Sequence, residues 1–192
     1  MAKRLEAICN QATCLGSIFT PTADELRLKM QDLCHSLILQ EESPEASHKI
    51  EDLLWKKVYH LTVRVFKQFK ETATNNEISL FAVHLFSGVG FYSNLIDVLK
   101  KELSMDPAFL DVQTSKRIEK GMQTVHRTMI FEGDLYRYLE ETGSHRCLNQ
   151  AMFWYQQAIL WNPSVGIPHN QLGTISSTDN YGLHAIYHYM RW

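Results

Sequence analysis

Apolar residues recur along most of the 192-residue chain at the three- and four-residue spacings of amphipathic helices, and the alternation typical of strands is absent. The pattern predicts an all-α protein. The first helix is expected at residues 2–15, and a second lies between a break at 20–25 and a linker at 41–47. Further helices are expected at 47–71, 77–103, 112–143, 145–161, 168–176 and from 181 onward.

Two of these helices show which side should be buried. In the second helix the expected core positions are Leu26, Met30, Leu33 and Leu37. In the helix at 47–71 a stripe follows one face, formed by Leu54, Val58, Leu61, Val65 and Phe69. The opposite face carries His60, Arg64 and Lys67, which project together because they are spaced four and three residues apart.

A repeat occupies the end of the chain. Ala151 and Ala185 are 34 residues apart, as are Tyr155 and Tyr189, and this is the tetratricopeptide period. Leu172-Gly173 lies between the two pairs, where the next unit of that repeat has its Leu-Gly. We therefore expect a single helical domain over 1–192 with tetratricopeptide-like helix pairs from about 145 to 192. Because no polar cap closes the last pair, the chain is expected to be the N-terminal fragment of a longer protein.

Composition narrows the class of protein. Hydrophobic residues make up 45% and charged residues 21%, and the formal net charge is -2, so a broad nucleic-acid-binding surface is not expected. The four cysteines have no zinc spacing and are too sparse for a disulfide scaffold. No signal peptide and no run of about 18 apolar residues is present, so no membrane span is expected. A cytoplasmic location is predicted, with shuttling to the nucleus left open.

Few residues indicate catalysis. His184 and His188 lie four apart on a predicted helix and could share a metal, but no third ligand accompanies them. Gly88-x-Gly90 resembles half of a dinucleotide fingerprint, yet it lies within a helix and lacks the third glycine. We expect no enzyme, no bound metal and no cofactor, with a small metal-dependent hydrolase as the remote alternative.

Gly88 and Gly90 still require an explanation, because a glycine inside a helix costs about 1 kcal/mol relative to alanine. They would permit either a tight helix contact inside the domain or a close subunit interface. The substitution Gly88→Glu separates the two. If the glycines form an interface, it should abolish pairing and leave the domain helical. If they belong to the core, it should reduce helicity.

Two basic features are candidates for binding an anion. The first is the face with His60, Arg64 and Lys67, which could hold a phosphate or an acidic peptide but could equally be a solvated helix surface. The second is Arg137-Tyr138, where a planar fork of donors stands beside a hydroxyl donor. The alternative there is that Arg137 pairs with Asp134 and Tyr138 packs in the core.

Residues 133–138, Gly-Asp-Leu-Tyr-Arg-Tyr, resemble the phosphate-binding helix of 14-3-3 proteins. Together with the segments at 52–59, 84–92, 151–158 and 168–174, they make residues 26–192 resemble the Est-one/Smg family of nonsense-mediated mRNA decay, in particular its Smg-five type. The resemblance implies a 14-3-3-like helical bundle that continues into tetratricopeptide-like pairs.

The resemblance also implies a function. Such domains are non-catalytic adaptors that bind phosphorylated segments of the RNA-decay helicase, and Smg-five-type members pair with Smg-seven-type relatives; a protein phosphatase is left open as a third partner. Arg137 and Tyr138 match the phosphate motif directly, and Asn170 matches the asparagine that holds the peptide backbone. His60 falls in the slot usually filled by lysine, and Lys67 fills a second basic slot.

Two hypotheses follow from the resemblance. A neutral histidine donates one hydrogen bond and lacks the permanent charge of lysine. The alternative to a phosphopeptide adaptor is therefore a pure dimerisation scaffold with a degenerate phosphate pocket. In either case the helix with Gly88 and Gly90 is the candidate dimer interface.

Overall fold

The computed structural model describes residues 1–104, 112–144, 146–178 and 182–192, and every regular element within these ranges is helical. The all-α prediction is confirmed. The elements are α1 (Ala2–Asn10), the 3-10 turn η1 (Leu15–Ile18), α2 (Pro21–Gln40), α3 (Pro44–Leu54), the π turn η2 (Trp55–His60), α4 (Leu61–Phe69), α5 (Asn75–Leu103), α6 (Val112–Glu140), α7 (Cys147–Trp161), α8 (Ile167–Thr178) and α9 (Gly182–Arg191).

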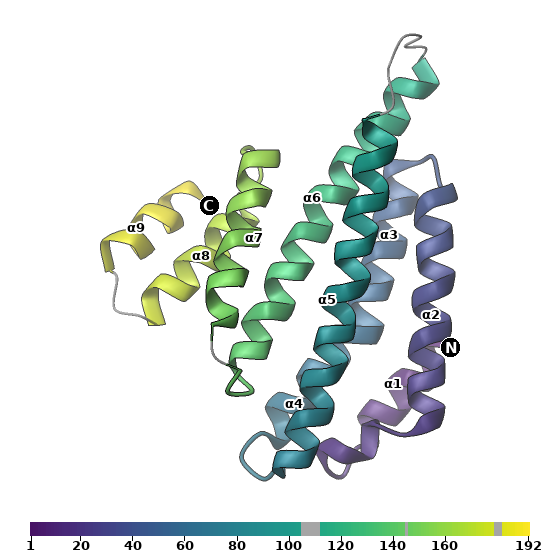
Figure 1. The fold of residues 1–192 in the computed structure, drawn as a ribbon, viewed down its shortest axis with the longest axis vertical. Coiled ribbons are helices and arrows are strands. Elements are labelled where there is room, and N and C mark those ends of the chain that lie inside the picture. The colour runs from purple at the N-terminus through teal and green to yellow at the C-terminus, as the bar shows by residue number, and fades with distance from the viewer. Residues whose placement is uncertain (105–111, 145, 179–181) are drawn as a thin grey trace.

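The long antiparallel helices α5 and α6 form the centre of the molecule (Figure 1). On one side α2 and α3 complete a bundle with them, and α4 lies at its lower end in this view. On the other side α7 packs along α6, and α8 and α9 form a helix pair beyond it. Helix α6 therefore joins the N-terminal bundle to the C-terminal helices.

Local sequence explains where several helices begin. The Thr20 and Ser43 hydroxyls accept hydrogen bonds from the first turns of α2 and α3, each of which has proline at its first position. Helix α5 begins with a reciprocal capping box between Thr74 and Glu77. The chain carries its own start signals at these three points.

The first helix is shorter than the predicted 2–15, because the chain leaves it at Asn10 to reach the start of α5. There the Gly16 amide donates to Glu77 Oε1 over 2.6 Å. A Cβ on Gly16 would lie 2.7 Å from that same oxygen, so a larger residue would have to displace the Glu77 carboxylate. This contact with a residue 61 positions away is invisible to local periodicity.

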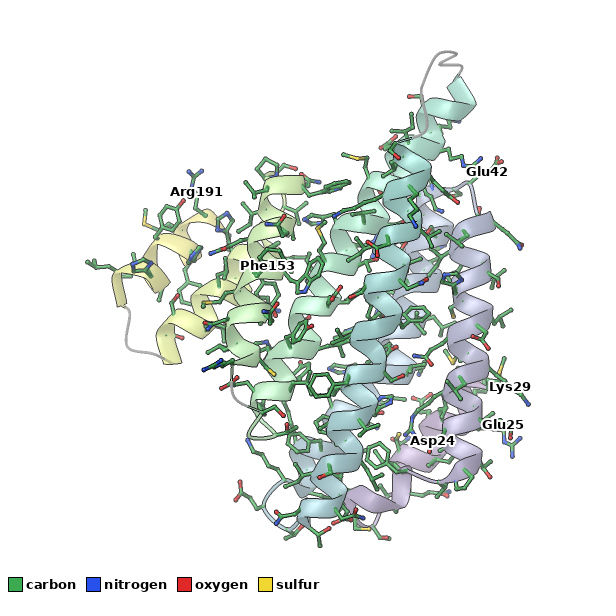
Figure 2. All side chains as sticks on the ribbon, in the orientation of Figure 1. Asp24, Glu25, Lys29, Glu42, Phe153 and Arg191 are labelled. Carbon is green, nitrogen blue, oxygen red and sulfur yellow. The ribbon has the colours of Figure 1, made fainter. Side chains whose placement is uncertain are left out.

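The buried side of α2 also differs from the prediction. Leu26 and Met30 are buried, but Leu33 and Leu37 are 48% and 40% exposed. The core instead receives a polar residue, Gln31, whose amide donates to the Tyr59 hydroxyl over 2.5 Å. On the outer side of α2, Glu25 and Lys29 point into solvent (Figure 2) and pair over 2.5 Å. The buried face is therefore rotated toward Gln31.

The predicted helix at 47–71 is present but not uniform. It begins earlier, at Pro44, and ends at Phe69, and the π turn η2 interrupts its α-helical winding. A π turn accommodates one extra residue and changes which side chains face the core, so Thr62, Val63 and Phe66 are also buried. Periodicity assumes a constant 3.6 residues per turn and so missed this element.

The remaining helices lie close to their expected positions. Helix α6 ends at Glu140, and Gly143 adopts the left-handed conformation predicted for a helix terminator three residues later, with φ of 85°. The loop expected between 103 and 112 falls outside the described residues.

The repeat corresponds to equivalent helix packing. A Cβ on Gly133 of α6 would lie 2.6 Å from the ring of Tyr155 in α7, and one on Gly173 of α8 would lie 2.7 Å from the ring of Tyr189 in α9. In both pairs a tyrosine thus rests on a glycine of the preceding helix. Ala151 and Ala185, one turn before each tyrosine, are buried.

Helix α5 has an unexpectedly apolar composition. Among the residues described, it is long and apolar enough to cross a membrane by those criteria alone, which the search for an unbroken apolar run did not anticipate. Only 33% of its apolar window is buried in the protein. Val83 and Phe86 are 65% and 49% exposed, so α5 presents an apolar outer surface.

Candidate phosphate-binding site

Arg137 is held near the end of α6 by a buried carboxylate. Asp134, 8% exposed, accepts a hydrogen bond from the Tyr155 hydroxyl over 2.7 Å and one from Arg137 Nη2 over 3.3 Å. Tyr155 reaches this position because Gly133 leaves room for its ring. The structure thus contains both parts of the alternative to an anion site: Arg137 pairs with Asp134, and Tyr138 is buried in the core with 7% exposed. Tyr155 of α7 also contacts Asp134.

Lys67 of α4 meets the same cluster. Its Nζ lies 5.0 Å from the centroid of the Tyr138 ring, and the guanidinium carbon of Arg137 lies 4.3 Å from that centroid. Both distances are within the range of cation–π attraction. The structure thus brings Lys67, Arg137 and Tyr138 together from two helices that are far apart in the sequence.

The other predicted site residues divide into two groups. His60, at the end of η2, is exposed and lies close enough to Asp134 to act on its carboxyl electrostatically. Arg64 instead turns toward α1, where its Nη2 donates to Asn10 Oδ1 over 2.6 Å. Asn170 lies in the first turn of α8, and no described contact joins its side chain to Arg137 or Tyr138. The geometry therefore gathers His60, Lys67, Arg137 and Tyr138 but not Arg64 or Asn170.

The charges in the cluster are strongly coupled. Burial raises the pKa of Asp134, although Arg137 and the Tyr155 hydroxyl favour its ionised form. Burial acts to lower the pKa of Arg137, but attraction to Asp134 outweighs it and the pKa is raised. Arg137 is therefore a permanent cation. Its Nε is buried and has no hydrogen-bond partner among the described residues.

The two glycines of α5 have different environments, and this corrects the prediction that both line an interface. A Cβ on Gly88 would lie 2.5 Å from the Tyr59 ring and 2.8 Å from Leu135. Gly88 is thus a tight contact inside the protein. A Cβ on Gly90 would meet nothing within 4 Å, so only Gly90 remains on the outer surface of α5.

The histidine pair of α9 is arranged differently from the predicted metal pair. His188 faces His169 of α8, and their Nδ1 atoms lie 3.0 Å apart. Burial lowers the pKa of both rings, which suits a hydrogen bond between two neutral imidazoles. Within the described parts of the chain, no three His, Cys, Asp or Glu side chains are grouped so that they could hold a metal ion.

A second buried carboxyl lies on the other side of α6. Glu132 accepts a hydrogen bond from the Ser93 hydroxyl over 2.6 Å, while its Oε2 has no partner in the described ranges. Burial raises the pKa of Glu132 from 4.5 to about 7. Because the folded state holds this proton more tightly than the unfolded chain, the resulting stability is present below about pH 4.5 and is lost as the pH rises through about 7.

We therefore expect Glu132→Gln to raise the free energy of unfolding at about pH 8 by up to roughly 3 kcal/mol and to flatten its dependence on pH. Urea unfolding at about pH 5 and pH 8 measures both effects. The exposed Glu119 of the same helix provides the control Glu119→Gln, which should leave the pH dependence unchanged. Parallel pH profiles for wild type and Glu132→Gln would contradict the burial argument.

Fold and site together define an all-α protein of antiparallel helices with a basic and aromatic cluster between α4 and α6. The sequence model of the family described as "Telomerase activating protein Est1" matches residues 49–143, and that described as "Est1 DNA/RNA binding domain" matches residues 151–191. The chain belongs to this Est1/SMG family.

Its relatives agree with this membership. The chain is 29% identical over 206 residues to nonsense-mediated mRNA decay factor SMG5 of Danio rerio and 30% identical over 207 residues to that of Mus musculus, and each alignment covers 98% of the chain. It is 24% identical over 208 residues to nonsense-mediated mRNA decay factor SMG7 of Arabidopsis thaliana, covering 89% of the chain. The chain spans 19%, 20% and 20% of these three proteins, about a fifth of their length.

Sequence reasoning identified Lys67, Arg137 and Tyr138 but missed the residues that support them. Tyr155 was assigned only to repeat packing, and His84 of α5 was not singled out. The available signal for Tyr155 was the glycine at 133, because a small residue in an amphipathic helix marks a close approach by another side chain.

Proposed function

We propose that this chain is a non-catalytic adaptor of nonsense-mediated mRNA decay that binds a phosphorylated segment of the RNA-decay helicase. Relatives named as nonsense-mediated mRNA decay factors support the process. The observation that carries the binding role is the convergence of Lys67 and Arg137 on the Tyr138 ring. Two cations held beside one aromatic ring can pair with the oxygens of a phosphate group.

The site also explains why a histidine can stand in the lysine slot. Lys67 already supplies a permanent charge opposite Arg137, so His60 needs only to donate one hydrogen bond. Phosphate recognition then depends less on His60 than the resemblance implies. This supports the adaptor hypothesis over a degenerate pocket.

Calorimetric titration with a phosphoserine peptide and its unphosphorylated twin tests the proposal. We expect the phosphopeptide to bind more tightly, and Lys67→Glu to weaken it by at least about tenfold because attraction is replaced by repulsion. Arg64→Glu, three residues away and facing α1, is the matched control and should retain most of the affinity. Equal loss in both variants would mean that general surface charge, and not this site, attracts the peptide.

The second candidate function, a dimerisation scaffold, is favoured by the outer surface of α5. Val83, Phe86 and Gly90 share this exposed side of the helix, and an apolar exposed face is typical of a protein interface. We propose that this face pairs with an SMG7-type relative. The two roles use different residues and are compatible.

We propose no direct contact with nucleic acid, despite the description of the matched C-terminal model. Residues 151–191 contain one Lys or Arg, Arg191. Binding to a nucleic-acid backbone uses several cations. A cytoplasmic location, with shuttling to the nucleus left open, remains part of the proposal.

A further inference from the structure

The π turn η2 ends at His60, directly before the helix that carries Lys67. An extra residue in a helix rotates everything after it by about 100° relative to regular winding. The contacts that stabilise η2 therefore set the direction in which the side chains of His60 and Lys67 point. Several helices contact η2, including α2 through the hydrogen bond from Gln31 to the Tyr59 hydroxyl. Two of the contacts involve α5.

The first contact is a hydrogen bond to the backbone of the π turn. The Val58 carbonyl oxygen accepts from the Thr62 hydroxyl over 2.9 Å and from His84 Nε2 over 3.2 Å. Because a carbonyl oxygen can only accept, Nε2 of His84 must carry the proton. Burial, with the nearby Arg27 charge, lowers the pKa of His84 to about 3, so the ring is a neutral donor at physiological pH.

The second contact is steric. The ring of Tyr59, within η2, is fully buried and stacks on His84 with ring centroids 5.5 Å apart. Its edge occupies the space that a Cβ on Gly88 would need, and Leu135 of α6 reaches the same space. Gly88 thus lies where η2, which precedes the helix that carries Lys67, and α6, which carries Arg137, both contact α5.

We propose that His84 and Gly88 are positioning residues of the phosphate site: His84 holds the π turn through the Val58 carbonyl, Gly88 seats Tyr59, and together they direct Lys67 toward Arg137. This inference rests on the proposed phosphopeptide function for its consequence in binding. The placement of Lys67 against Tyr138 can be measured without any ligand.

The test compares two substitutions of His84 in the 192-residue chain. His84→Phe keeps a ring to stack on Tyr59 but removes the donor, and we expect phosphopeptide affinity to fall about tenfold as the buried Val58 carbonyl loses this partner. His84→Gln retains an amide donor near the Nε2 position, and we expect affinity within about threefold of wild type. Nuclear Overhauser contacts between the Lys67 side chain and the Tyr138 ring should be lost in His84→Phe and kept in His84→Gln.

The two glycines supply a matched pair that changes less of the protein. Gly88→Ala must displace Tyr59 or Leu135 and should weaken both the Lys67–Tyr138 contacts and phosphopeptide binding. Gly90→Ala, two residues further on the open face, should change neither and should leave the melting temperature equal to or slightly above that of wild type.

The outcomes separate the two claims. If His84→Phe and Gly88→Ala lower only the melting temperature and keep the Lys67–Tyr138 contacts and the affinity, the positioning role is wrong. Wild type could instead bind no phosphopeptide while the Lys67–Tyr138 contacts are lost in His84→Phe and kept in His84→Gln. The positioning role would then stand and the proposed function would fail.

Discussion

Gly88→Glu is expected to lower the free energy of unfolding by more than about 4 kcal/mol, enough to unfold much of the chain. The new Cβ would lie 2.5 Å from Tyr59 and 2.8 Å from Leu135, and a carboxylate would be placed in a buried aromatic region without a partner. Circular dichroism during thermal or urea unfolding measures the loss.

Gly90→Glu provides the control, since the same side chain is added two residues later where nothing lies within 4 Å. It should melt within a few degrees of wild type. If the outer surface of α5 pairs with a relative, Gly90→Glu should also abolish that pairing in size-exclusion or pull-down assays. If Gly88→Glu melts like wild type, Gly88 is not a buried contact, and the hypothesis that both glycines belong to a dimer interface holds again.

Arg137→Glu is expected both to abolish phosphopeptide binding and to lower the melting temperature by about 6–20 °C. The sequence presented these as alternatives, one for a binding residue and one for an anchor. We expect both effects together, because the side chain that meets Lys67 at the Tyr138 ring also neutralises the buried Asp134. Leaving one member of a buried pair without its partner costs about 3–5 kcal/mol, and each kcal/mol shifts the melting temperature of a chain this size by about 2–4 °C.

A double substitution separates the two roles of Arg137. Asp134→Asn with Arg137→Gln removes both charges, keeps a group that can accept from Tyr155, and should recover most of the stability but none of the binding. Arg117→Glu, on the exposed part of α6, controls for charge reversal on the same helix and should affect neither property. Recovery of phosphopeptide binding by the neutral pair would contradict a role for Arg137 in holding phosphate.

Much of the fold was predictable because its signals are local. The helix start after Thr20 was predicted from its capping side chain. Ser43 and Thr74 cap their helices in the same way, but those helices begin slightly before the predicted positions, at Pro44 and Asn75. The positions of Lys67, Arg137 and Tyr138 followed from helix spacing and from a short motif. Their partners did not, since Asp134 meets Tyr155 across two helices and α5 reaches Val58 through His84.

The sequence by itself determined that the chain is helical, where most helices lie, and which residue types could hold a phosphate. Only the tertiary structure decided that Gly88 is interior and Gly90 is not, that Arg64 turns to α1, and that a π turn precedes the helix whose Lys67 meets the Tyr138 ring. Periodicity orders residues around the axis of their own helix, whereas the direction that each face takes depends on neighbours far away in the sequence. One extra residue in a turn is enough to rotate a face by about 100°.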